Sequence, residues 1–145
     1  MILSSAEIQS RLMMPGGAGR LVITPFNDAS LQPASYDLRA GEEIVLAPGT
    51  VTLVPSMEHV EIPGDVAATL RCRSSYARRG LLLGGGFVDP GFRGQLTLCL
   101  VNMGAEEVVL PEGERVVQMI LHEVGDGAAC YNGRYQDSEG VVEAR

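Results

Sequence analysis

The sequence lacks a surplus of basic residues. Its 145 residues include 11 Lys and Arg against 18 Asp and Glu, which gives a formal net charge of −7. A nucleic-acid groove or a module that lies on a membrane surface needs a basic face, so both kinds of partner are disfavoured. A small polyanionic substrate is compatible with this charge, because a local cluster of arginines sets the field where the substrate binds.

Histidine and cysteine are scarce. His59 and His122 do not stand in metal-ligand spacing, so we expect no metal held by side chains. Cys72, Cys99 and Cys130 form no Cys-x-x-Cys pair, and an odd number of thiols fits a reducing cytoplasm. In that setting the thiols act mostly as small apolar groups.

Long apolar segments are absent as well. No run approaches the ~20 apolar residues of a membrane-spanning helix. The N-terminus has no basic stretch followed by an apolar one, which would mark a secretory leader. We therefore expect a cytoplasmic protein with no membrane partner.

The sequence consists mainly of short apolar segments separated by Pro and Gly, with turn signals at residues 47–49, 63–65, 90–91 and 111–113. The expected strands are Leu21–Thr24, Glu43–Leu46, Thr50–Val54, His59–Ile62, Val66–Leu70, Gln95–Val101, Glu107–Leu110 and Arg115–Leu121. Short strands at near-even spacing, without a βαβ rhythm, predict an all-β barrel or jelly roll.

One helix is expected, at Ser4–Met13. Ser4 and Glu7 have the spacing of a capping box, and Ile8 and Leu12 share one face.

The length predicts a single domain over residues 1–145, with the helix and its lead-in at 1–20. Residues 125–145 are Gly-rich and polar, which favours a frayed, mobile tail. The alternative is a tail that closes over a ligand with Tyr131, Arg134 and Tyr135.

A basic cluster interrupts this acidic chain. Four arginines lie within residues 71–79, and Arg73 is followed by Ser74 and Ser75. A guanidinium offers paired donors to phosphate oxygens, and serine hydroxyls and N–H groups at a turn add neutral donors. The alternative is a solvated basic loop, but four arginines in so short a segment favour anion binding.

A glycine run at residues 84–86 leads into Phe87, Val88 and Asp89. Such a run permits close backbone approach to a flat ligand, or equally a tight bend in a barrel wall. Asp89 precedes Pro90-Gly91 and is either a turn former or a carboxylate that takes a proton from water beside the arginines.

The strand at 95–101 alternates, and Cys99 points away from its leucines. No histidine nearby would activate the thiol, so we interpret Cys99 as a packing residue. Gln118 can offer an amide to a ligand, although its position alone favours an ordinary strand residue.

Taken together these segments resemble the superfamily of trimeric dUTPases and dCTP deaminases, over nearly the whole chain. The similar segments, in order, are MILSSAEIQSRL with ITPFNDASLQPASYDLRAG, RSSYARRG, GGFVDPGFRGQLTL with Asn102, GERVVQMIL and YNGRYQDSEG. Several motifs in the right order are far more specific than any one. The resemblance implies a distorted β jelly roll (the dUTPase-like β-clip), assembled as a homotrimer with active sites between subunits.

The resemblance also assigns roles to residues. It implies triphosphate contacts by Arg73, Ser74, Ser75, Arg78 and Gln118, with Tyr131 and Arg134 closing on the phosphates. It implies a hairpin at Gly86, Phe87 and Val88 that reads the pyrimidine, and an aromatic ring at Phe92 under the deoxyribose. Asp89 matches the acid that meets the 3′-hydroxyl and orients water. Mg²⁺ is expected with the triphosphate, held mainly by phosphate oxygens and water.

One departure decides the expected activity. The deaminases of this superfamily have a glutamate ten residues after the aspartate, and here that place holds Cys99. A neutral thiol is a poor substitute for a carboxylate that shuttles protons, and the zinc deaminase signature is missing. We therefore expect a dUTP diphosphatase that forms dUMP and diphosphate in pyrimidine deoxynucleotide metabolism. The alternatives are a dCTP deaminase and a non-catalytic nucleotide-binding regulator.

Overall fold

The computed structural model describes residues 1–145 and confirms the all-β prediction. The helical elements are α1 (Ser5–Leu12), a 3-10 turn (Asp28–Ser30) and α2 (Ser74–Ala77). The strands are β1 (Val22–Thr24), β2 (Leu31–Gln32), β3 (Ser35–Arg39), β4 (Ile44–Leu46), β5 (Val51–Glu61), β6 (Val66–Cys72), β7 (Leu81–Leu83), β8 (Phe87–Val88), β9 (Arg93–Asn102), β10 (Val108–Leu110) and β11 (Arg115–Glu123). Neither helix is long and apolar enough to cross a membrane.

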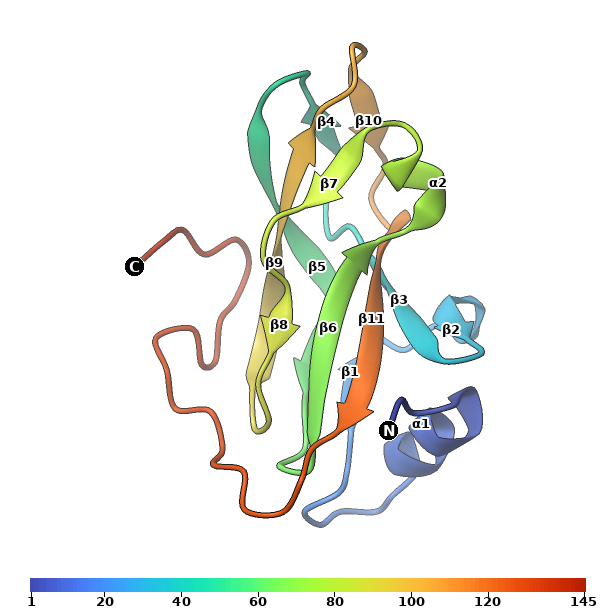
Figure 1. The fold of residues 1–145 in the computed structure, drawn as a ribbon, viewed down its shortest axis with the longest axis vertical. Helices are drawn as coiled ribbons and strands as arrows, with labels where there is room; N and C mark the ends of the chain where they lie inside the picture. Colours follow the sequence, from blue (N-terminus) through green and yellow to red (C-terminus); the bar gives the residue numbers. More distant parts are fainter.

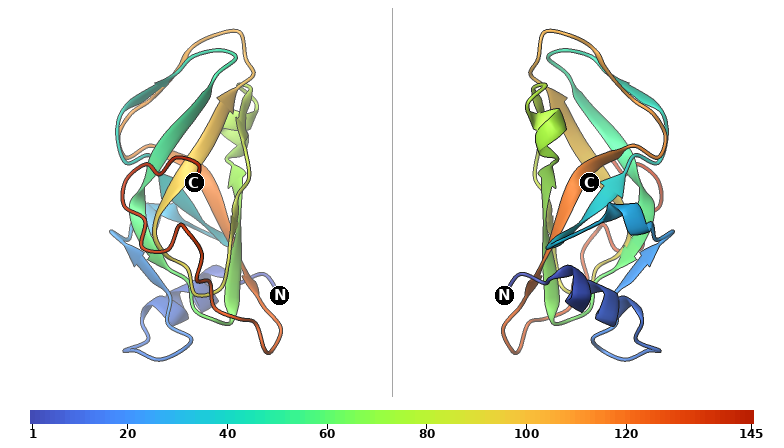
Figure 2. Two further views of the ribbon diagram at one scale, coloured as in Figure 1. Left: turned by 90° about the vertical axis from the view of Figure 1, so that its left-hand side faces the viewer. Right: turned by 90° about the vertical axis from the view of Figure 1, so that its right-hand side faces the viewer.

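The strands form a distorted β jelly roll. One sheet has the order β1-β5-β9-β7 and the other β2-β3-β11-β6-β8, and the ribbon β10-β4 lies at the top of the molecule in Figure 1. The left view of Figure 2 separates β5 and β9 from β6. Leu98 and Leu100 of the first sheet and Met119 and Leu121 of the second are fully buried in one hydrophobic cluster. The core therefore lies between the two sheets.

The expected helix is present as α1. Ser4 is its N-cap and accepts from the N–H of Glu7, while the Glu7 carboxylate accepts from the Ser4 N–H at 2.7 Å. Ile8, on the inner face of this helix, is fully buried. The capping box thus begins the helix where the sequence predicts.

The prediction of two separate strands at Thr50–Val54 and His59–Ile62 is wrong, because both belong to β5. Pro55 pairs with Thr97 and His59 with Gln95, so three residues of β5 stand opposite one of β9. This bulge lets a strand that contains proline continue, since the extra residues leave the ladder.

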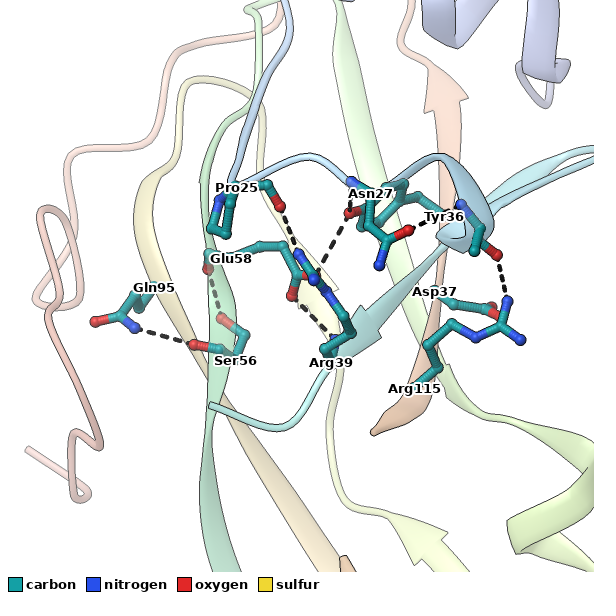
Figure 3. Close-up of polar contacts among 10 residues, drawn as sticks. Pro25, Asn27, Tyr36, Asp37, Arg39, Ser56, Glu58, Gln95 and Arg115 are labelled. Atoms are coloured by element: carbon teal, nitrogen blue, oxygen red, sulfur yellow. Dashed lines mark hydrogen bonds and ion pairs between the residues drawn. The ribbon is translucent and has the colours of Figure 1, made fainter. Parts of the chain in front are cut away.

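A buried polar network fills the space between the bulge and β3 (Figure 3). Glu58 is fully buried, and its Oε1 lies 2.7 Å from Nε of Arg39. Glu58 Oε2 also accepts from the backbone N–H of Arg39 at 3.0 Å, and the Arg39 side chain donates to the carbonyl of Pro25. The polar side chains of strand β3, Asp37 and Arg39, belong to such networks, and this strand was not among the predicted ones.

Residues after Glu123 form no helix or further strand, apart from one parallel bridge between Gly94 and Ser138. This C-terminal segment runs beside β8 and β9, on the left of Figure 1.

Candidate functional site

The largest cavity, of about 590 Å³, lies between the C-terminal segment and the outer face of β5 and β9. The turn after β8 contributes Asp89, strand β9 contributes Cys99, and the C-terminal segment contributes Tyr131 and Tyr135. Most of the lining is apolar. Asp89 is the single carboxylate that lines this cavity, and no histidine, lysine or arginine does so.

The glycine run makes the hairpin that leads to this cavity. Gly86 has φ +110°, and a Cβ there would lie 3.0 Å from the carbonyl oxygen of Leu70. The Gly86 carbonyl accepts from the Leu70 N–H at 2.6 Å, so the close approach is to β6. Phe87 and Val88 then pair with Thr69 and Ala68. Glycine is required at position 86 for two reasons. Other residues are strained at this positive φ, and a side chain would be too close to the backbone of β6.

Asp89 is exposed at the mouth of the turn. The backbone closes the turn, since the N–H of Phe92 donates to the carbonyl oxygen of Asp89 at 3.2 Å. The carboxylate is therefore not needed to form the turn, and it faces the cavity.

Phe92 and Tyr131 lie in contact with each other beside the cavity. Phe92 is buried, and its ring meets that of Tyr131 edge to face with 5.8 Å between centroids. The Tyr131 N–H donates to the carbonyl of Pro90 at 2.7 Å, which attaches the C-terminal segment to the hairpin. Arg134 does not line the cavity, and its side chain donates to the carbonyl of Arg145. Tyr135 lines it instead.

Cys99 faces the cavity, as the alternation of β9 predicts. It is half-buried, pairs with Leu53 and lies against Gly84. The thiol is thus part of an apolar wall on the same cavity as Asp89.

The basic motif lies in a different region of the chain. Arg73 is the N-cap of α2, which contains Ser74 and Ser75 and is followed by Arg78. Nη1 of Arg73 donates to the carbonyl of Arg115 at 3.0 Å. Tyr76 anchors α2 through a 2.8 Å hydrogen bond to Glu114, and burial, then that bond, raises the pKa of Tyr76 to about 12.

Asp37 is a member of this region that the sequence prediction missed. Its Oδ2 is buried and lies 2.9 Å from Nε of Arg73 and 3.7 Å from Nη1 of Arg115, which is drawn beside it in Figure 3. Burial raises the pKa of Asp37, and the two arginines oppose that rise. Asp37 therefore sets the position of the Arg73 guanidinium. The alternation of polar and apolar residues over 35–39 was the signal that could have revealed it.

Gln118 lies in the same region. It pairs with Asp37 across β3 and β11, and its Nε2 donates to Ser35 Oγ at 2.9 Å. The side-chain amide is thereby held on the outward face of the sheet near Arg73.

The two regions do not meet within one chain. Val88, next to Asp89, pairs with Ala68, and Arg73 follows Ala68 by five residues (73 − 68) along β6. At about 3.3 Å per residue, the hairpin and the basic motif are roughly 16 Å apart along the strand. In Figure 1 the C-terminal segment and α2 lie on opposite sides of the molecule.

The structure contains no group of three or more His, Cys, Asp or Glu side chains that could hold a metal ion. Asp37, the buried carboxylate of the basic region, is already paired with arginines. A divalent cation at this site would therefore take its ligands mainly from the phosphates of a bound nucleotide and from water.

The chain is similar to a known family and to named proteins. A family model described as dCTP deaminase-like matches residues 39–124. The dCTP deaminase of Thermococcus sibiricus is 40% identical over 135 residues, covering 82% of this chain and 86% of that protein. A protein of Leifsonia xyli subsp. xyli named "dCTP deaminase, dUMP-forming" is 31% identical over an alignment of 185 residues. The alignment covers 100% of this chain and 90% of that protein.

Among solved structures, the native EIAV dUTPase is similar with a TM-score of 0.65 and 22% identity, covering 80% of this chain and 98% of that one. At that identity the similarity establishes the fold. It agrees with the jelly roll built from the sheets.

Proposed function

This chain belongs to the dCTP deaminase-like family, and on that premise we propose that it is a dUTP diphosphatase that hydrolyses dUTP to dUMP and diphosphate. One observation carries the choice within the family. The cavity is lined by one carboxylate, Asp89, and the residue ten positions later, Cys99, brings a thiol to the same cavity. Hydrolysis needs one group that accepts a proton from water, whereas deamination needs a group that also returns protons to the base and to the leaving ammonia.

In the proposed reaction Asp89 orients a water molecule and accepts its proton. The water oxygen forms a bond to the α-phosphorus, and the bond from that phosphorus to the oxygen bridging to the β-phosphate breaks. The diphosphate leaves with the electron pair. Arg73, Ser74, Ser75 and Gln118 stabilise its charge with preorganised donors. Arg78 belongs to the same region and adds a further cation. Mg²⁺, held by the phosphates and water, would supply Lewis-acid stabilisation of the same charge.

The hairpin supports binding of the base and sugar. Phe87 and Val88 line the cavity, Gly86 comes directly before them, and Phe92 offers an aromatic ring packed on Tyr131. We propose that the pyrimidine lies along this backbone with the deoxyribose over Phe92.

The separation of the two regions supports a homotrimer with shared sites. The strand rise along β6 places Asp89 and Arg73 roughly 16 Å apart. The simplest way to complete a binding site around Asp89 is therefore with the basic region of a neighbouring copy. Symmetric assemblies commonly complete sites in this way.

The second candidate is a dCTP deaminase, and the names of the relatives favour it. The Thermococcus sibiricus protein is named for that activity, and the Leifsonia xyli name adds dUMP as its product. Against it stands Cys99, because an uncharged thiol does not replace a carboxylate that shuttles protons.

Product analysis separates the candidates. We expect purified protein with Mg²⁺ to convert dUTP to dUMP and diphosphate and to release no ammonia from dCTP. Ammonia release from dCTP at a rate comparable to dUTP hydrolysis would replace this proposal with the deaminase. Tight binding of dUTP without any product would indicate a nucleotide-binding regulator.

A further inference from the structure

The C-terminal segment is attached to β9 by a short series of regularly spaced contacts. The Asp137 N–H donates to the carbonyl of Arg93 at 2.9 Å. Next to this contact Gly94 and Ser138 form a parallel bridge, and the Gln95 N–H donates to the Ser138 carbonyl at 2.8 Å. A Cβ on Gly94 would lie 2.8 Å from the nitrogen of Ser138, so glycine is needed for this approach. Ser138 is almost fully buried as a result.

Beyond Ser138 the segment leaves backbone pairing and is held by side chains of β9. Gln95 Oε1 accepts from the N–H of Gly140 at 2.6 Å, and Thr97 Oγ1 accepts from the N–H of Val142 at 3.0 Å. Both partners recur every second residue, at 95 and 97 and at 140 and 142. That period matches two extended chains running in the same direction.

Gln95 is itself fixed from behind. Its Nε2 donates to the carbonyl of Ser56 at 3.0 Å, as drawn in Figure 3. Ser56 is fully buried in the β5 bulge, and its hydroxyl accepts from the Leu96 N–H at 2.9 Å and donates to the Glu58 carbonyl at 2.7 Å. The amide that holds Gly140 therefore has little freedom to turn.

These contacts complete the cavity. Val142 and Ala144 line it from the segment, opposite Leu53 and Cys99 on the sheet.

We propose that Gln95 and Thr97 are positioning residues that seat residues 138–144 on β9 of the same chain and thereby build the outer wall of the cavity that holds the base. The inference rests on the proposed function only for the identity of the nucleotide. The seating itself is a property of the free protein.

The first test is amide hydrogen exchange of the full-length protein without nucleotide. The N–H groups of Gly140 and Val142 are expected to be protected. Thr97→Val keeps the shape and removes the acceptor, so exchange at Val142 should rise by about 2–10-fold, the range for one lost neutral hydrogen bond. Thr97→Ser keeps the hydroxyl and should restore protection. Thr52→Val on β5, which does not line the cavity, is the matched control.

The second test is kinetic. Thr97→Val should raise KM for dUTP by a similar factor while kcat is unchanged, and Thr97→Ser should rescue KM. Val142→Pro removes the donor from the other side of the same bond. The double variant with Thr97→Val should then be no worse than either single variant.

The outcomes are distinguishable from those that test the proposed function. Unprotected amides at 140 and 142 in the wild type, or protection that Thr97→Val does not change, would overturn the seating whatever nucleotide the protein uses. An unchanged KM with the expected exchange would overturn the role of the wall in binding. Absence of dUTP turnover would leave the exchange result standing and count against the diphosphatase alone.

Discussion

Asp89 and Cys99 face one cavity from consecutive elements, the turn after β8 and the strand β9, ten positions apart in the chain (99 − 89). The cavity thus contains a carboxylate and a thiol where two carboxylates would permit different chemistry.

The first prediction concerns the carboxylate. Asp89→Asn should reduce dUTP hydrolysis by at least about 10²–10⁴-fold, because the amide keeps the shape and accepts no proton. Binding of the α,β-imido analogue of dUTP, measured by calorimetry, should be retained. Near-normal turnover by this variant would reduce Asp89 to a turn residue.

The thiol should behave in the opposite way. Cys99→Ala is expected to leave kcat for dUTP unchanged, because Cys99 contributes only to an apolar wall beside Leu53 and Gly84. Steady-state kinetics of this variant serve as the matched control for Asp89→Asn. A loss of similar size in both would make the thiol part of the chemistry.

The third prediction concerns the basic region. Arg73→Ala should weaken binding of the imido analogue by about 1.5–3 kcal/mol, as expected for a lost charge-assisted hydrogen bond. Arg20→Ala, an exposed arginine near β1, should not change it. Equal affinity of wild type and Arg73→Ala in calorimetry would mean that the basic motif is a solvated loop that does not bind the phosphates.

The buried Glu58 should be important for stability. Glu58→Ala leaves the mostly buried Arg39 without its carboxylate and is expected to cost about 3–5 kcal/mol in the free energy of unfolding. Urea denaturation measures the loss. Glu61→Ala, at the exposed end of the same strand, should change stability by no more than about 0.5 kcal/mol. Similar effects of the two substitutions would show that the network contributes nothing specific.

The ion pair between Arg93 and Asp137 predicts a pH dependence of tail docking. A hydrogen bond from Arg93, with Nη2 3.0 Å from Oδ2, lowers the pKa of Asp137. A carboxyl group with a lowered pKa stabilises the docked tail at pH values above the ordinary carboxyl pKa. That stabilisation is lost as the pH falls through the lowered pKa. In Arg93→Gln the Asp137 pKa should rise toward its ordinary value, as followed by carboxyl carbon NMR. An unchanged titration would mean that the pair is absent in solution.

The sequence predicts the apolar frame of this fold well and its polar strands poorly. Alternation identifies β9 and β11, and Ser4 with Glu7 identifies α1. Proline at position 55 suggested a strand end, because the sequence does not show that the partner strand leaves room for a bulge. Strand β3 was missed since Asp37 and Arg39 look exposed until their partners, distant in sequence, are known.

The candidate site divides in the same way. The turn chemistry around Asp89 and the clustered arginines are local signals, and a sequence shows them directly. The contacts of Gln95 and Thr97 with the C-terminal segment bridge about 45 residues and leave no pattern in either partner.

The mode of attachment of that segment bears on how the protein can vary. Its donors at positions 140 and 142 are main-chain N–H groups, which every amino acid except proline carries. Any residue except proline at position 142 therefore keeps this donor. Gly140 has φ +61°, which side chains rarely adopt, and Asp137 also holds the segment through its side chain, so those two positions are less tolerant. The acceptors are specific side chains at 95 and 97, so part of the information that places residues 140–142 is encoded in a strand 45 residues upstream.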